Sequence, residues 1–232
     1  MKLEELLDKL FPAGRRIEPE GVIVHGTGRL ADKEVAIIGT QDDTPLGARE
    51  LLRLARLILE VVEKSPGTPI LMLVSSCGQR MALNEELLGL GQYIAVCLQA
   101  QETARRVGHK LVALIYGQAV AGGFIAFGLG ADRICAAPDA QTFVMNLKAV
   151  ARVTKQPLDR LEALAEKIPV FAPGVGNFFK MGGLNEIWED VSPERLERLL
   201  AATDTADTRA TLGEQRGGRA LTQKIIDEIV NR

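Results

Sequence analysis

The stretch from Leu111 to Ala131 constrains the fold of this chain more than any other, because it carries no charged residue and is rich in glycine. It is long enough to cross a bilayer as a helix. Its two halves differ, however: LVALIY is a short aliphatic run that favours a strand, whereas GGFIAFGLG has helical spacing. A buried strand, a tight turn and a helix explain the glycines, and a single membrane span does not. We therefore predict a strand–turn–helix unit here.

The flanking segments alternate between strand and helix patterns. Paired strands are predicted at 22–28 and 34–40, followed by a helix at 46–64 that is buried on most of its circumference. This order predicts an α/β layered domain with crossover connections. The other predicted strands are 69–74, 111–116, 133–137 and 141–145, and the other predicted helices are 2–10, 84–107, 122–130, 158–167 and 220–230.

The predicted domain covers residues 1–200. Residues 201–218 are polar and glycine-tipped, and we interpret them as a mobile linker before a C-terminal helix, so that 201–232 forms an extension. A length of 232 residues with 47% hydrophobic residues supplies ample material for one large core.

Composition excludes several classes of function. A formal net charge of −2 gives no basic field for nucleic acid. Cys77, Cys97 and Cys135 are scattered, none forms CxxC, and only His25 and His109 could join them, so neither a zinc site nor a disulfide framework is expected. The first residues are acidic and lack the apolar core of a signal peptide. We expect a cytoplasmic protein without a metal.

The pair Gly122–Gly123 is the first candidate site. It lies where the predicted buried strand turns into a helix, and glycine lets the backbone approach a ligand closely. Unpaired amides at such a turn can bind a carboxylate or a developing oxyanion. The alternative is that two small residues only allow the helix to pack against the sheet.

A second turn of the same type supports the functional interpretation. LMLVSSCGQR (71–80) is also a buried strand that ends in small polar residues and a glycine before a helix, so two sets of amides could meet at one pocket. Ser75, Ser76 and Cys77 are better explained as turn residues and a buried thiol than as nucleophiles, because no histidine is near them in the sequence.

These segments resemble a known family. GQAVAGGFIAFGLGADR (117–133) resembles the glycine-rich strand-to-helix segment of the crotonase-like superfamily, and more closely that of the α-type half of acyl-CoA carboxyltransferases. NEELLGLGQYIA (84–95) is similar to the same half, and FKMGGLNEIWE (179–189) to a late turn of crotonase-like chains. Together with GTGRLADKEVAIIGTQDD (26–43), the set most resembles the γ subunits of biotin-independent malonate decarboxylases, over roughly residues 15–195.

The resemblance implies an α/β fold of the crotonase-like (ClpP/crotonase) type, built from repeated strand–strand–helix units. It implies a hetero-oligomer with a homologous β decarboxylase subunit. The implied substrate is a malonyl thioester, carried on an acyl carrier protein that has a CoA-derived prosthetic group. The products would be the acetyl thioester and carbon dioxide, with no cofactor bound by this chain. The implied catalytic amides are Gly122 and Gly123, and the implied substrate-binding residues are Ala121, Cys77, Gly78 and Gln79.

Four alternatives were weighed. A serine peptidase of the Clp type would need serine at Ala121 and histidine at Met145, and both are absent. A biotin-dependent carboxyltransferase component differs from a decarboxylase in its carboxyl acceptor rather than in fold, so the sequence leaves this alternative open. A non-catalytic scaffold subunit also stays open. A crotonase-type hydratase ranks lower, because residues 117–124 contain no paired carboxylates.

Overall fold

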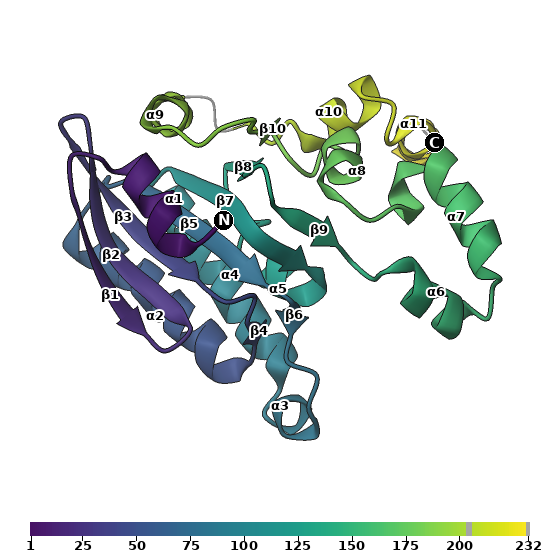
Figure 1. Ribbon diagram of the computed structural model, residues 1–232, viewed down its shortest axis with the longest axis horizontal. Helices are drawn as coiled ribbons and strands as arrows, with labels where there is room; N and C mark the ends of the chain where they lie inside the picture. The colour runs from purple at the N-terminus through teal and green to yellow at the C-terminus, as the bar shows by residue number, and fades with distance from the viewer. Residues whose placement is uncertain (203–205, 231–232) are drawn as a thin grey trace.

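The computed structural model describes residues 1–202 and 206–230 and is organised around one mixed β-sheet (Figure 1). Three strands form an antiparallel meander at one side of the sheet, namely β1 (Arg15–Glu20), β2 (Ile23–Leu30) and β3 (Lys33–Thr40). From β3 the sheet continues in parallel through β5 (Ile70–Ser76), β7 (Leu111–Val120), β8 (Arg133–Ala136) and β10 (Glu186–Ile187). The short strand β9 (Gln141–Phe143) pairs in parallel with the last residues of β7.

Helices cover both faces of the sheet and enclose two hydrophobic cores. One core lies under α2 (Ala48–Lys64), α4 (Leu90–Arg106) and α5 (Ala121–Ala126), and the other lies under α1 (Leu3–Leu10) and α9 (Pro193–Ala201). Side chains of β5 alternate between these cores, with Met72 in the first and Leu71 and Leu73 in the second. The predicted continuous apolar strand is thus confirmed, because covering both faces requires apolar residues at every position.

Two helices are shorter than their sequence patterns predict, and glycine is the reason in both. The predicted helix 84–107 is divided into α3 (Leu83–Leu87) and α4, because Gly89 between them adopts φ +80°. The predicted helix 122–130 ends at Ala126, and Gly128 follows with φ +132°. Its position is tight, since a Cβ at Gly128 would lie 2.9 Å from the Phe124 ring. Both backbone conformations are ones that other residues rarely adopt.

β1 has no counterpart among the predicted strands. Its sequence RRIEPE contains a proline and four charged residues, a composition typical of a loop. The strand nevertheless pairs with β2 along its whole length, with Pro19 opposite Val24. Charge and proline are tolerated here because β1 is an edge strand with one neighbour.

The C-terminal part lies to one side of the sheet, beyond β9 (Figure 1). It contains α6 (Leu147–Thr154), α7 (Leu158–Lys167), the 3-10 turn η1 (Pro169–Phe171), α8 (Val175–Lys180), α10 (Arg209–Gln215) and α11 (Ala220–Val230). The segment expected to be a linker therefore contains a helix, α10. Within the described residues, no helix has both the length and the apolarity needed to cross a membrane, and Leu111–Ala131 folds largely as β7 and α5.

Candidate active site

The candidate site begins with an irregularity at the end of β7. Val74 of β5 is opposite Ile115, but Ser76 is opposite Ala119, so the residues 116–118 of β7 face Ser75 alone. The extra length carries the backbone away from the regular ladder and into the turn before α5. The backbone groups in this bulge need partners from elsewhere in the chain.

Asp43 supplies the missing partner. Its Oδ1 accepts hydrogen bonds from the Gln118 amide at 2.6 Å and from the Ser75 hydroxyl at 2.8 Å, while the Asp43 amide donates to Ser75 Oγ at 2.9 Å. A Cβ at Gly117 would lie 2.5 Å from both Asp43 Oδ1 and Ser75 Oγ, so only glycine fits. The sequence singled out neither Asp43 nor Gln118 for this role. The only signal was the QDD at 41–43, which was used as part of the resemblance.

After the bulge the chain turns sharply at Ala121, which adopts φ +43°. This left-handed conformation is unfavourable for alanine by roughly 1–2 kcal/mol. It places Gly122 and Gly123 at the start of α5, directly against the small parallel pair formed by β4 (Pro45–Leu46) and β6 (Gly78–Gln79). Strained backbone that the surrounding structure enforces is concentrated at functional sites.

The two turns predicted from the sequence come together. A Cβ at Gly123 would lie 2.5 Å from Ser76 Oγ and 2.9 Å from the Gly78 Cα. A Cβ at Gly78, which has φ +117°, would lie 3.9 Å from the Ala121 Cβ. Ala121, Gly122, Gly123, Gly78 and Gln79 therefore form one corner. Both interpretations of the glycine pair, packing and ligand binding, need this close approach.

In this structure the Gly122 amide has a partner from its own chain. It donates to the Gln79 side-chain oxygen Oε1 at 2.9 Å. A neutral acceptor oxygen of the same chain thus occupies the hydrogen-bonding position of this amide. Binding by Gly122 therefore requires Gln79 to rotate away, at a net cost of about 0.5–1.5 kcal/mol for the hydrogen bond lost.

A second glutamine fixes the other end of the same short helix. The Gln101 amide nitrogen donates to the Ala126 carbonyl at 2.7 Å and to the Cys97 carbonyl at 3.1 Å. Gln101 is buried within α4, so α5 is tied to that helix at its carboxyl end and to β6 at its amino end. Sequence reasoning did not single out Gln101.

Cys77 corrects one expectation. Its thiol is exposed rather than buried, because β5 ends at Ser76 and Cys77 already belongs to the turn. The buried thiols are Cys97 and Cys135. Burial raises the pKa of Cys97 to about 12 and raises that of Cys135 as well, so both are neutral near pH 7. Among the described residues, no group of histidine, cysteine and acidic side chains could hold a metal ion.

A polar cavity lies beside the bulge of β7, on the side of α1. Its volume is about 500 Å³, and Asp43, Ser75, Gly117 and Gln118 contribute to its wall, as does the buried Tyr116. The Tyr116 hydroxyl donates to the Thr40 carbonyl at 2.7 Å, and burial raises its pKa. On β7 the wall of this cavity ends at Gln118, so the cavity lies beside the bulge and Gly122 and Gly123 do not line it.

Met145 and Ala121 occupy the positions where a serine peptidase would carry its histidine and serine. Met145 is half-exposed in the segment between β9 and α6, and Ala121 has no group that could exchange a proton with it. The strained turn at Ala121 is present, but the chemistry of a serine peptidase is not.

Comparison with known proteins gives consistent results. The model of the family "Malonate decarboxylase gamma subunit" matches residues 41–232. The malonyl-S-ACP:biotin-protein carboxyltransferase MADD of Malonomonas rubra is 31% identical over 239 aligned residues, covering 89% of this chain and 82% of that protein. Among solved structures, the Pseudomonas malonate decarboxylase hetero-tetramer in complex with coenzyme A has a TM-score of 0.79 at 24% identity, covering 96% of this chain and 98% of that one. The Pseudomonas MdcD–MdcE hetero-dimer has a TM-score of 0.71 at 26% identity, covering 98% and 96%.

Proposed function

Because the chain belongs to the malonate decarboxylase γ-subunit family, whose fold is crotonase-like, we propose that it helps to decarboxylate a malonyl thioester through the backbone amides of the Gly122 corner. This proposal rests on the hydrogen bond of the Gly122 amide, whose nitrogen lies 2.9 Å from an acceptor oxygen. The amide follows directly after Ala121, whose backbone is strained. The oxygen belongs to Gln79, a flexible side chain that a substrate oxygen can displace.

The reaction needs what this corner offers. When the bond between the methylene carbon and the carboxylate breaks, carbon dioxide leaves and the electron pair delocalises onto the thioester oxygen as an enolate. A proton then adds to the methylene carbon and gives the acetyl thioester. Fixed amide donors stabilise the developing oxyanion, and a metal or a nucleophile is not required. In this proposal Gly122 and Gly123 serve as these donors, and their neighbours Ala121, Cys77, Gly78 and Gln79 contact the substrate.

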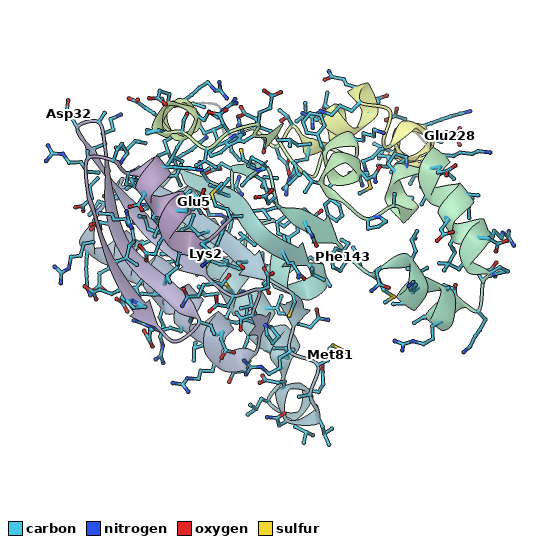
Figure 2. The ribbon with its side chains drawn as sticks, in the orientation of Figure 1. Lys2, Glu5, Asp32, Met81, Phe143 and Glu228 are labelled. Atoms are coloured by element: carbon cyan, nitrogen blue, oxygen red, sulfur yellow. The ribbon has the colours of Figure 1, made fainter. Side chains whose placement is uncertain are left out.

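We propose that a homologous β subunit completes the pocket in a cytoplasmic complex. Support comes from the related Pseudomonas proteins, which form a hetero-dimer and a hetero-tetramer. Large apolar side chains next to the corner are exposed by 59–79%; they are Met81, Leu83, Leu87 and Leu88 (Figure 2 shows Met81 at the edge of the molecule). Such exposure on one segment is typical of surfaces that another protein covers. The thioester would arrive on an acyl carrier protein, as the name of the Malonomonas relative indicates for that protein.

The test is Gly122→Ala in the complex with the partner subunit. The new Cβ would lie 2.6 Å from the present position of Gln79 Oε1, so it would fill the space that the substrate oxygen needs. Loss of one oxyanion donor lowers kcat by roughly 10²–10³-fold. Release of labelled carbon dioxide from a carboxyl-labelled malonyl thioester measures this.

Gly91→Ala is the matched control, because a Cβ at Gly91 in α4 meets nothing within 4 Å. Its activity should match that of the unmodified complex. If Gly122→Ala also keeps the full rate in an intact complex, the glycines only permit packing and the chain acts as a scaffold subunit.

Transfer of the carboxyl group to biotin is the second candidate. The similarity to the Malonomonas carboxyltransferase favours it, since that relative is named for transfer to a biotin protein. The same labelled thioester distinguishes the two. Label released as carbon dioxide without a biotin protein supports decarboxylation, and label recovered only on an added biotin protein supports transfer.

A further inference from the structure

A second cavity lies in the C-terminal part of the chain, and none of the residues of the Gly122 corner lines it. Its volume is about 960 Å³, within the range of small-molecule binding sites. Its wall is formed by η1, by α8 with the turn that follows it, and by α10 and the start of α11. Leu129, which follows α5, forms the wall on the side of the sheet.

The lining of this cavity is mostly apolar. One side of the wall is formed by Leu129, Phe178 and Met181. The other side is formed by Val170 of η1 and by Ile168, which directly precedes η1. Ile168 is 39% exposed and Val170 is 64% exposed. A bound apolar group would remove this surface from water, which is favourable by roughly 25 cal/mol per Å².

The walls are held in place by two arginines. Arg209 donates to the Leu129 carbonyl at 2.7 Å and pairs with Asp207. Arg216 donates to the carbonyls of Phe179 at 2.8 Å and Leu184 at 2.7 Å, and its guanidinium lies 3.6 Å from the centre of the Phe179 ring. These contacts fasten α10 to the turn after α8.

Glycines allow the same surfaces to meet backbone to backbone. Gly182 has φ +81°, and a Cβ there would clash with the Arg209 carbonyl. A Cβ at Gly218 would clash with the carbonyl of Lys180. The turn after α8 is therefore already in contact with α10 and with the turn before α11, so a ligand would not have to bring these three segments together.

The charged groups of the lining are predominantly positive. The hydrogen bond from Arg209 lowers the pKa of Asp207 to about 2, so these two side chains form a neutral pair. Lys167 and Arg219 remain, and across residues 1–202 and 206–230 neither forms an ion pair. The aliphatic part of Arg219 packs against Gly213, where a Cβ would lie 2.7 Å from the Arg219 Cδ.

We propose that this cavity binds a small organic anion with an apolar body, whose carboxylate or phosphate group is held by Lys167 and Arg219. The apolar lining selects the body, and the two cations without acidic partners select the charge. None of the residues of the Gly122 corner lines this cavity, and the inference does not depend on the decarboxylase proposal.

The test uses decanoate, decyl phosphate and decanol as probes in isothermal titration calorimetry with the full chain. We expect both anions to bind at one site and decanol to bind at least tenfold more weakly. The ratio of the two anion affinities identifies the preferred head group. The double variant Lys167→Gln/Arg219→Gln should lose about tenfold in affinity for the anions and none for decanol.

Matched variants separate the site from non-specific binding. Ala210→Phe places a ring into the cavity from an exposed position on α10 and should abolish binding, whereas Ala163→Phe, exposed on α7 outside the lining, should not. Arg152→Gln on α6 makes the same charge change elsewhere and should leave the affinity unchanged.

Three results would overturn the proposal. They are no saturable binding of either anion, equal affinity in the double variant and the unmodified chain, and binding to the isolated chain that disappears in the complex with the partner subunit. The last result would make the cavity part of a protein interface.

Discussion

Ala121 holds a backbone conformation that glycine would adopt more readily. Its φ of +43° is imposed by the bulge before it and by the contact of α5 with β6. In Ala121→Gly the strain of about 1–2 kcal/mol is relieved, and the greater freedom of glycine in the unfolded chain offsets about 0.5–1 kcal/mol of that gain. We predict a variant up to about 1.5 kcal/mol more stable, measured by urea denaturation.

The matched change is Ala121→Val, because a β-branched residue tolerates positive φ poorly. It should destabilise the chain by more than 1 kcal/mol. Equal stability of all three proteins would show that the turn relaxes freely and that no strain is stored there.

The cysteines differ in the chemistry that their surroundings permit. Cys77 is exposed, whereas Cys97 and Cys135 are buried with raised pKa values. We predict that iodoacetamide modifies only Cys77 in the folded chain at neutral pH, and that Cys77→Ser abolishes this modification. Mass spectrometry of the intact chain measures the outcome, and labelling of the serine variant without denaturant would contradict it.

The same burial predicts a dependence of stability on pH. The Cys97 thiol ionises near pH 8.5 when unfolded and near 12 when folded, so the folded chain holds the proton over this window. Its contribution to stability is fully present below pH 8.5 and is lost as the pH rises towards 12. At pH 10 this thiol lowers the free energy of unfolding by about 2 kcal/mol. Between pH 7.5 and pH 10 the free energy of unfolding of Cys97→Ala should therefore fall by about that much less than that of the unmodified chain.

At the residue scale the sequence predicted that Gly122 and Gly123 lie at a strand–helix turn, which the structure confirms, whereas their part in catalysis stays a prediction. The position of Gly122 and Gly123 could be predicted because two consecutive glycines between a strand pattern and a helix pattern indicate a tight turn. The hydrogen bonds of Asp43 and Gln79 could not be predicted, because each side chain accepts from a backbone amide that is tens of residues away in the sequence. No local pattern marks such contacts.

At the scale of elements, Glu85 ties α3 to the first turn of α2. It is buried, its Oε2 accepts from the Ala48 amide at 2.7 Å, and its Oε1 lies 3.3 Å from Arg80. Glu85→Ala leaves the Ala48 amide and Arg80 without this partner, so we predict a loss of about 2–3 kcal/mol in the free energy of unfolding. Glu85→Gln keeps an acceptor and should lose less.

Glu86→Ala is the control, since Glu86 is exposed on the same short helix. It should change stability by less than about 0.5 kcal/mol. If Glu85→Ala is equally mild, α3 is not anchored through this side chain.

The elements that the sequence predicted best are those buried on both sides. β5 and the first part of β7 are continuous apolar runs. A strand between two layers of helices is buried on both faces and therefore needs apolar residues at every position. α6, α8 and α10 were missed because they are only six to eight residues long and contain few or no buried residues, so each offers little periodic pattern. The break between α3 and α4 depends on the left-handed backbone of Gly89, which helical spacing alone does not reveal.

At the scale of the whole molecule, Arg216 holds the C-terminal segment against the domain. It donates to three backbone carbonyls and stacks on Phe179, and desolvation lowers its pKa. We predict that Arg216→Ala speeds amide hydrogen exchange in α10 and α11 while the exchange of β5 and β7 stays unchanged. Arg195→Ala on α9 is the control. Unchanged exchange in α10 would mean that the glycine contacts alone hold this segment.

The edge strand β1 determines how this chain can associate. Proline and charged side chains along its free side discourage another strand from adding to the sheet. At the opposite margin β10 offers only two paired residues, too short a template for strand addition. Association through an intermolecular β-ladder is thereby disfavoured at both margins. We therefore expect complexes of this chain to form through its helix and loop faces.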